Sequence, residues 1–421
     1  MAGTFLNHPF DEEIFLREWR NEPDPVRNAL VQSGVIVNYP AITAALKDYG
    51  NFGTIPYYKP LSGDPVNYDG QTDITVTETS GGHQSFVAYG RAKAWRERDF
   101  MPELVGNDPL GHIVRANAKY WQNQRQKILI SVLEGVIANS DTGFAKHKIK
   151  VDRPSDNATL PGTINTKLAE VFGAEKGALR LMIMDAVTAA VFENLNLLEY
   201  RKGVSVNALL VDMRIGELMG YTVIVDDNVF NIGKQYIYVL GLGAILTGVP
   251  RLDRPVELDR DGLKYGGTTA LITRVRDVLH PNGFSFVIPS SDWSESPTDA
   301  QLSASTSYTI KYPHKMIPIA KIVFVDSVTF TATADGVSGT TTSTKIDFVF
   351  SQDIHGLTAS DITIAAGSPG AATKGALTGS GKNWSLAITG VSEGNVGVTI
   401  ASKDEYTFPT TPASVAVYKK P

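Results

Sequence analysis

The longest regular pattern of apolar positions in this chain lies between residues 108 and 138. Apolar side chains recur there at the spacing of one helix face, with a single polar gap at Arg125. Asp108 is a good N-cap residue, and Pro109 suits the first helical position. We therefore predict one helix of about 30 residues and roughly 45 Å, with Trp121, Ile128 and Val132 on its apolar side.

Residues 49–98 show a different pattern, because proline and glycine punctuate them and little apolar periodicity remains. The alternating run at residues 74–77 predicts a strand, Gly81-Gly82 predicts a hairpin turn, and residues 86–89 predict the returning strand. A two-stranded hairpin alone is only marginally stable in water. Two interpretations stay open: a long loop resting on its own domain, or an arm that lies on a neighbouring subunit.

The flanking segments have a mixed pattern. Residues 11–19 predict one or two helical turns, which Pro23 and Pro25 interrupt, and residues 40–47 predict a short helix. Further on we predict helices at 163–172, 185–200 and 215–219, and strands at 179–184, 209–211, 221–225, 236–240, 257–258, 271–275 and 284–288. The last three strands should form an antiparallel sheet, with a turn at Pro281-Asn282-Gly283.

The pattern changes again near Pro318. From residue 322 to the end there is no arginine and no methionine, and short alternating runs recur between clusters of glycine, serine and aspartate. These runs lie at 323–331, 345–350, 362–364, 384–388, 396–400 and 414–418. Several short strands at this spacing predict a β-sandwich of about 100 residues, with Phe348, Trp384 and Ile388 in its core.

Composition narrows the class of protein. The 421 residues are 43% hydrophobic and 20% charged, as in an ordinary globular protein. A net charge of -5 argues against a dedicated nucleic-acid-binding protein, although not against one that encloses nucleic acid. Cysteine is absent, which excludes disulfides and thiolate catalysis. We see neither a secretory signal nor an apolar run long enough for a membrane span.

No set of residues predicts catalysis, a cofactor or a metal. Asp226-Asp227 is better explained as a solvated turn, and the mixed charges of residues 251–264 as a salt-bridged surface or interface. The seven histidines lack metalloprotease spacing, and the glycines at 241 and 243 lack the third glycine of a dinucleotide loop. We therefore expect a protein without catalytic, cofactor-binding or metal-binding residues.

The order of these parts resembles the major capsid proteins of tailed double-stranded DNA bacteriophages, which have the Hong Kong 97 coat-protein fold. The stretch from Asn51-Phe-Gly-Thr-Ile-Pro-Tyr-Tyr to Arg98 resembles the E-loop, and the helix at 108–138 resembles the spine helix. The segment from Val256-Glu-Leu-Asp-Arg-Asp-Gly to Phe286 resembles the return into the peripheral domain. The C-terminal segment resembles a bacterial immunoglobulin-like domain.

This resemblance implies an α+β fold with an appended all-β sandwich. Its parts would be an N-terminal arm (1–48), an E-loop (49–98), a peripheral domain with the spine helix (99–150 and 251–320), an axial domain (151–250) and an immunoglobulin-like sandwich (321–421). The E-loop would contact an adjacent subunit through Tyr57, Tyr58, Tyr68, Ile74, Val76, Phe86, Tyr89 and Trp95. Neither Lys59 nor Lys93 lies in a recognisable cross-linking motif, so we expect no covalent cross-link.

The same resemblance implies a structural role. Subunits would form hexamers and pentamers of an icosahedral shell, assembled in the bacterial host cytoplasm and ending in the virion capsid. We expect an uncleaved subunit, a separate scaffolding protein and a portal. The sandwich would face outwards, where it could stabilise the lattice or bind host-surface glycans weakly. Lys119, Arg125 and Lys127 form either a solvated helix face or a mildly basic surface toward packaged DNA, contacted non-specifically.

Three alternatives stay open. An encapsulin-like shell protein of a cellular compartment would share the fold. A bacterial surface adhesin could be built on the sandwich, although neither a signal nor an anchor is visible. An unrecognised α/β enzyme is the third, although no residues present themselves as its active site.

Overall fold

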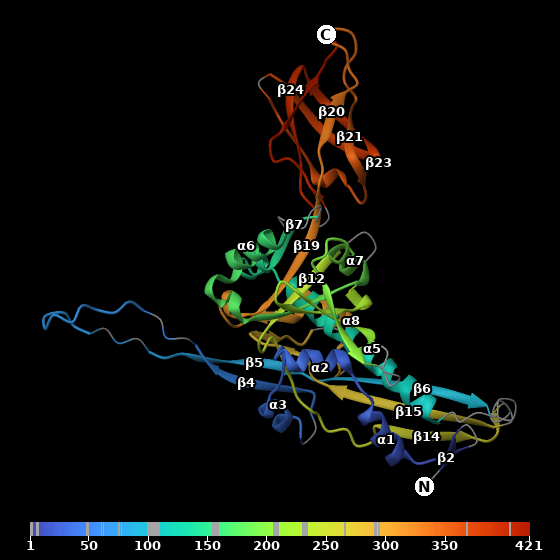
Figure 1. The fold of residues 1–421 in the computed structure, drawn as a ribbon. Helices are drawn as coiled ribbons and strands as arrows, with labels where there is room; N and C mark the ends of the chain where they lie inside the picture. Colours follow the sequence, from blue (N-terminus) through green and yellow to red (C-terminus); the bar gives the residue numbers. More distant parts are fainter. Residues whose placement is uncertain are drawn as a thin grey trace. The chain divides into compact units, whose positions relative to one another are not determined.

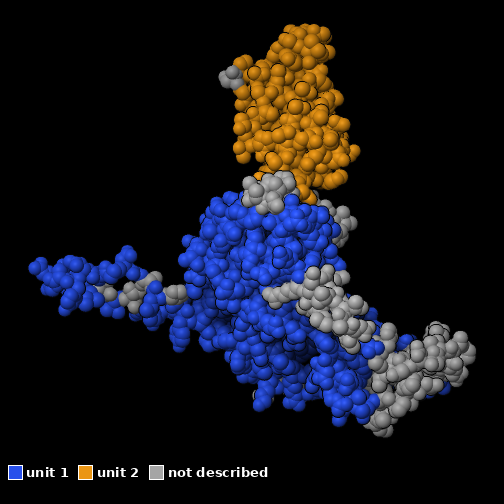
Figure 2. All heavy atoms as spheres, in the orientation of Figure 1, with its two compact units in different colours: residues 1–149, 156–231, 235–322 blue, residues 150–155, 232–234, 323–421 orange. Residues whose placement is uncertain are grey.

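The computed structural model describes residues 3–5, 8–47, 50–59, 61, 63–74, 76, 78–98, 110–153, 160–204, 210–229, 235–264, 267–289, 293, 295–367, 369–403 and 406–421. Helices and strands are mixed, so the predicted α+β class is confirmed. The chain separates into two compact units (Figure 2). Unit 1 comprises residues 1–149, 156–231 and 235–322, and unit 2 comprises residues 150–155, 232–234 and 323–421.

The α-helices of the described chain all belong to unit 1. They are α1 (Glu12–Asn21), α2 (Pro25–Gln32), α3 (Pro40–Ala45), α5 (Leu110–Ile137), α6 (Leu160–Phe172), α7 (Ala186–Asn194) and α8 (Asp299–Ser303). Asp11 caps α1 and Asp24 caps α2 through their side-chain oxygens. Pro25 was expected only to interrupt a helix, yet it opens one, because a first-turn residue has no intrahelical partner for its N–H.

Helix α5 is the long helix that the sequence predicts (Figure 1). Its buried residues include Trp121, Ile128 and Val132. The predicted cap at Asp108 lies outside the described residues. The polar gap at Arg125 is filled by an ion pair with Asp277, so this charge is neutralised where the helix meets the next layer.

That layer is a three-stranded antiparallel sheet of order β14-β15-β6, formed by β14 (Val256–Asp261), β15 (Thr268–Asp277) and β6 (Tyr89–Arg98). The Trp121 indole N–H donates to Thr273 Oγ1 at 3.0 Å and joins α5 to β15. The predicted partner strand at 284–288 is not part of this sheet. Instead β17 (Phe284–Phe286) pairs with β18 (Tyr308–Ile310), and the predicted turn follows β16 (His280–Pro281).

Unit 1 also contains a larger mixed sheet of order β19-β12-β8-β11-β10-β9. Its strands are β8 (Leu179–Met184), β9 (Glu199–Val204), β10 (Leu210–Leu218), β11 (Tyr221–Val225), β12 (Gln235–Gly241) and β19 (Ile319–Ser327). Strand β7 (Lys148–Asp152) pairs with β19, in which the chain passes from unit 1 to unit 2. The parallel pair β8–β11 and the antiparallel neighbour β12 are almost entirely buried.

Two helix predictions in this region are wrong. The helix predicted at 185–200 ends at Asn194, because Asn196 adopts a positive φ of 54° and β9 follows. The helix predicted at 215–219 is part of β10. Met219 and Gly220 both adopt positive φ, 51° and 82°, and make a tight two-residue turn from β10 into β11.

The remaining small elements complete unit 1. They are β1 (Gly3–Phe5), β2 (His8–Phe10), β3 (Ile36–Asn38) and β13 (Ile245–Thr247), with 3-10 turns η1 (Phe144–His147), η2 (Gly173–Ala178), η3 (Asp227–Val229), η5 (Ser305–Ser307) and η6 (His314–Met316). A sheet of order β16-β13-β3 ties the N-terminal segment to the segment that carries His280.

Unit 2 consists of two three-stranded sheets around one core. One has the order β20-β21-β23, with β20 (Phe330–Ala334), β21 (Lys345–Ile354) and β23 (Ala371–Ser392); the other has the order β22-β24-β26, with β22 (Ile362–Ala365), β24 (Gly394–Ile400) and β26 (Ala413–Val417). Strand β25 (Tyr406–Thr407) pairs with the end of β19. Phe348 and Ile388 are buried in the core, whereas Trp384 is half-buried and donates to the Gly381 carbonyl.

Candidate assembly surface

The predicted arm has a root of two paired strands and, beyond it, a tip whose described residues form no strand. Strand β4 (Phe52–Tyr58) pairs with β5 (Gly81–Val87), from Phe52 opposite Val87 to Tyr58 opposite Gly81. Residues 59–80 lie beyond these pairs, and we refer to them as the arm tip (Figure 1). The predicted hairpin is therefore corrected. Gly81-Gly82 lies within β5, where a larger residue at 82 would meet the Tyr57 ring, and neither Ile74 nor Val76 lies in a strand.

The arm root is fixed to the body of unit 1 by a buried polar cluster. Gln84 Oε1 accepts from the Gly283 N–H at 2.8 Å and lies 3.3 Å from His280 Nε2. Phe86 is fully buried beside them and packs against His280 edge to face. Burial lowers the pKa of His280 to about 3, so the ring is neutral at ordinary pH. The root is thus part of the core of unit 1.

Two aromatic rings hold the outer end of the root. Tyr57 packs edge to face against Tyr312 with centroids 4.8 Å apart, and its hydroxyl donates to the Lys311 carbonyl at 3.2 Å. Ser85 donates its N–H to Ser285 Oγ at 3.1 Å. These contacts reach Tyr57, and Tyr58, the next residue, is exposed.

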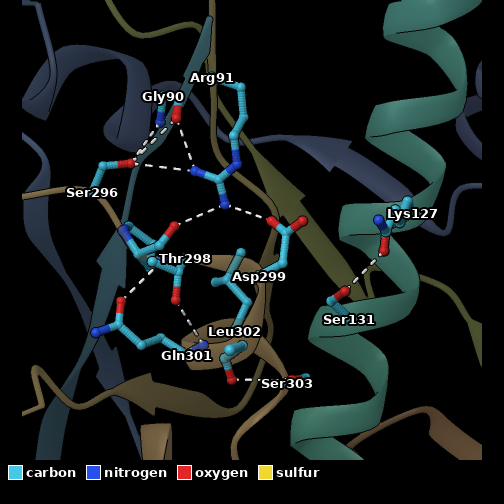
Figure 3. A network of polar contacts seen from close by, with 12 residues as sticks. Gly90, Arg91, Lys127, Ser131, Ser296, Thr298, Asp299, Gln301, Leu302 and Ser303 are labelled. Carbon is cyan, nitrogen blue, oxygen red and sulfur yellow. Dashed lines mark hydrogen bonds and ion pairs between the residues drawn. The ribbon is translucent and has the colours of Figure 1, made fainter. Parts of the chain in front are cut away.

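Arg91 anchors the strand that follows the arm (Figure 3). Its guanidinium donates to Asp299 Oδ1 at 2.6 Å and to the Pro297 carbonyl at 2.8 Å. Ser296 Oγ accepts from the Gly90 N–H at 2.9 Å, and Thr298 with Gln301 forms a capping box that starts α8. Because α8 packs on α5, the beginning of β6 is held on the long helix.

The arm tip has no comparable cover within the described chain. Tyr68 and Val76 are 93% and 90% exposed, and Leu61 and Ile74 are also exposed. Tyr58, the last residue of β4 before the tip, is 90% exposed. A local turn nevertheless orders the tip around Asp69, whose carboxylate accepts from the N–H groups of Gln71 and Thr72. These bonds lower the pKa of Asp69 to about 2. Tyr68 is therefore presented outward on an organised turn.

Sequence reasoning missed a concentration of arginines in unit 1. A cavity of about 350 Å³ opens where α1, α5, β6 and β15 meet, and we call it the arginine pocket. Six arginines line it against three acids, Glu22, Asp24 and Asp277; the arginines are Arg20, Arg27, Arg91, Arg125, Arg274 and Arg276. The available signal was the spacing of Arg274 and Arg276, because residues two apart share one face of a strand. The strand was predicted only over 271–275, whereas β15 extends to Asp277 and includes both arginines.

The positive charges of three arginines in this pocket act on the Tyr89 hydroxyl. Burial raises the pKa of the Tyr89 hydroxyl, and the nearby charges of Arg125, Arg91 and Arg27 oppose that rise. Burial also lowers the pKa of Arg125. Within the described part of the chain, Arg20 and Arg27 form no ion pair, so their charges are available at the rim.

The chain was compared with known proteins. No family model matches it. Its sequence is 27% identical over 302 residues to the "Major capsid protein" of Bacillus phage SPP1, a match that covers 70% of this chain and 90% of that protein. The chain resembles a phage major capsid protein. This similarity confirms the family resemblance predicted from the sequence.

Solved structures are less similar to this chain in sequence. A chain of Mycobacterium phage Bobi matches with a TM-score of 0.43 and 13% identity, over 70% of this chain and 89% of that one. The structure titled "Cyanophage Pam1 capsid asymmetric unit" matches with a TM-score of 0.43 and 11% identity, over 72% and 93%. Scores below 0.5 are too low to carry an argument about this chain.

The predicted contact residues of the capsid-like arm fall into two groups. Tyr58, Tyr68, Ile74 and Val76 are exposed and belong to the arm tip or its edge. Phe86 and Tyr89 are instead buried in unit 1, and Trp95 is half-buried against Tyr120 with centroids 5.3 Å apart. The assignment of Phe86 and Tyr89 to a contact between subunits is corrected, because both side chains are buried within the chain itself, whereas that of Trp95 stays a prediction. Tyr57 is bound at the root.

Two further features are absent from the described residues. Among the described residues, no group of three or more histidines and acids is placed to hold a metal ion. No helix in the same part of the chain combines the length and apolarity that a membrane crossing needs.

Proposed function

We propose that this chain is the structural major capsid protein of a tailed double-stranded DNA phage and not an enzyme. It self-assembles into hexamers and pentamers of an icosahedral shell that encloses the genome. Assembly takes place in the host cytoplasm, and the protein ends in the virion capsid. The arm carries this proposal, because its root is bound inside unit 1 while its tip exposes apolar side chains. The similarity to the SPP1 protein supports it.

An exposed aromatic tip on a rigid root suits contact with another subunit. Apolar surface is most stable when water is removed from it, at roughly 25 cal/mol per Å². Tyrosine is also enriched at protein interfaces, since it buries a large area and loses little side-chain entropy. Contact between the tip and a neighbouring copy would remove Tyr58, Tyr68 and Val76 from water without unfolding the root.

The remaining partners follow from the same proposal. A separate scaffolding protein and a portal would direct assembly, and packaged DNA would be contacted only non-specifically. Lys119 and Lys127 are exposed on α5, which suits loose contact with phosphate. Unit 2 would be an outward-facing immunoglobulin-like domain that stabilises the lattice or binds host-surface glycans weakly. Subunits would not be cross-linked through Lys59 or Lys93, so boiled shells should run as monomers on a gel.

The experiment that tests the proposal uses the register of the arm. Replacing residues 59–80 by Asn-Gly closes β4 and β5 with a two-residue turn between Tyr58 and Gly81. Negative-stain electron microscopy and sedimentation then compare this variant with the full chain, each expressed with and without its neighbouring genes. The full chain should form closed shells or rings, and the arm-replaced variant should stay folded but unassembled. A full chain that stays monomeric under every condition would contradict the proposal.

A further inference from the structure

We infer that the arm tip of one copy docks in the arginine pocket of a second copy of this chain. This inference rests on the proposed function and adds to it the surface that receives the arm. Four of the pocket's arginines have partners within the folded chain, whereas Arg20 and Arg27 form no ion pair within the described residues. Nothing within the described chain covers the exposed side chains of the tip. The two surfaces are complementary in charge, in size and in side-chain type.

Charge is the first argument. The arm tip carries four acids, Asp64, Asp69, Asp73 and Glu78, against the single basic residue Lys59, and it contains no arginine. All four acids are exposed. The arginine pocket has the opposite balance, with six arginines and three acids in its lining. Complementary potentials of this kind direct association and exclude wrong partners.

Availability of the charges is the second argument. Asp277 already neutralises Arg125, Asp299 already binds Arg91, and Glu257 already pairs with Arg274 at 2.9 Å. Arg20 and Arg27 are exposed and form no ion pair within the described residues. An incoming carboxylate could therefore pair with them without breaking a contact of the folded chain.

Shape and side-chain type give the third argument. The Asp69 turn presents Tyr68 on a fixed support, so little conformational entropy is lost when its ring is bound. The cavity of about 350 Å³ exceeds the volume of one aromatic side chain, and Trp19 and Trp121 lie in its wall. Guanidinium groups beside these rings offer a tyrosine both stacking and cation–π contacts.

Charge reversal tests the electrostatic part. Arg20→Glu with Arg27→Glu inverts the rim, and Asp64→Lys with Asp73→Lys inverts the tip. Each double variant should raise the subunit concentration needed for assembly by roughly tenfold or more, since a tenfold change corresponds to a modest loss of contact energy. Combining all four changes in one chain should restore assembly. Arg17→Glu, which lies on α1 with Arg20 but outside the pocket lining, is the matched control and should assemble normally.

A disulfide tests the position directly, because the chain contains no cysteine of its own. Tyr68→Cys is combined with Gln124→Cys, which lies in the pocket wall, or with the exposed neighbour Asn123→Cys as the control. Oxidised shells with the Gln124 pair should give a ladder of covalent oligomers on a non-reducing gel. The Asn123 pair should give essentially none.

The outcomes distinguish a failure of the docking inference from a failure of the proposed capsid function. Shells that form normally in both charge-reversed variants, without a ladder from the Gln124 pair, would overturn the docking inference and leave the capsid function standing. The docking inference is also overturned if the variant with all four substitutions assembles no better than either double variant. A full chain that never assembles would instead remove the proposed function itself. Circular dichroism and sedimentation of each unassembled variant show that the comparison concerns folded subunits.

Discussion

Arg125 is the residue that interrupts the apolar face of α5, and its partner Asp277 is almost fully buried. Glu134, about two and a half turns further along the helix, has a similar arrangement. It accepts from Lys321 Nζ at 2.8 Å and from the Tyr238 hydroxyl, and the Lys321 ammonium lies 3.8 Å from the centroid of the Tyr236 ring. Such pairs add little net stability when intact, yet removing one partner leaves a desolvated charge.

We therefore expect Asp277→Ala to lower the free energy of unfolding by about 3 kcal/mol, because Arg125 would be left partly buried without its partner. Urea denaturation of the arm-replaced subunit, which should not assemble, measures this. The control is Arg17→Ala, which breaks an exposed pair with Glu18 and should change the value by less than about 0.5 kcal/mol. Equal effects of the two substitutions would contradict the interpretation that Arg125 is a partly buried charge that needs Asp277 as its partner.

Two buried histidines should make the subunit sensitive to acid. Burial lowers the pKa of His147 to about 4 and that of His280 to about 3, below the ordinary value near 6.5. The unfolded chain therefore takes up protons first as the pH falls. The stability contributed by the neutral rings is complete above pH 6.5 and is lost as the pH falls toward 4.

Each histidine should contribute a slope of roughly 1.4 kcal/mol per pH unit between pH 6 and 5. Urea denaturation across that range measures the slope. His280→Gln retains a polar side chain beside Gln84 and should reduce the slope by about half. A slope that this substitution leaves unchanged would show that other groups cause the acid sensitivity.

At the scale of elements, a helix or strand could be predicted from the sequence where its pattern lies within one segment of the chain. The long helix, the buried strand at 179–184 and most strands of unit 2 follow from periodicity alone. The β10–β11 turn did not, because Met219 gives no hint of the positive φ that it adopts. The sequence located the hairpin arm, but the predicted pairing of its strands was wrong, because β5 pairs with β4, almost 30 residues earlier in the chain. The arginine pocket joins four separate elements, which no single-segment pattern describes.

The packing of α8 on α5 gives a prediction at this scale. Gly135 lies where α8 crosses, and a Cβ there would clash with the Leu302 carbonyl and lie 2.7 Å from the Tyr308 ring. Gly135→Ala should therefore destabilise the subunit by about 1 to 3 kcal/mol, although alanine favours helix. Gly162 in α6 has open space around it, so Gly162→Ala should instead stabilise by about 0.5 to 1 kcal/mol. Thermal denaturation of both variants would contradict this if the shifts had the same sign.

At the scale of the whole molecule, the two units have separate interiors. The hydrophobic core of unit 2 is formed entirely by residues between 328 and 417, from both of its sheets. The long strand β23 folds back on itself, and Thr378 Oγ1 donates to the Ser385 carbonyl across the fold. It therefore contributes two neighbouring segments to one sheet. A segment with its own core between two sheets should fold without the rest of the chain.

Residues 323–421 expressed alone should therefore unfold cooperatively, with an m-value of about 1 to 2 kcal/mol/M in urea as expected for a domain of this size. Circular dichroism and the dispersion of amide signals in an NMR spectrum check this. Phe348→Ala, which removes a fully buried ring, should lower the stability by about 3 to 5 kcal/mol. The exposed Val349→Ala is the control. A non-cooperative transition of the isolated segment would show that its core is incomplete.

The division of the arm into a bound root and an uncovered tip has a consequence for mass action. Contacts of the root are intramolecular, so their contribution does not depend on how much protein is present. The proposed contacts of the tip would require a second molecule, and their contribution would grow with subunit concentration. On this proposal the subunit would fold fully in dilute solution, whereas the tip would be covered only above a threshold concentration. Below that threshold the chain would be a folded monomer whose arm tip is exposed to water.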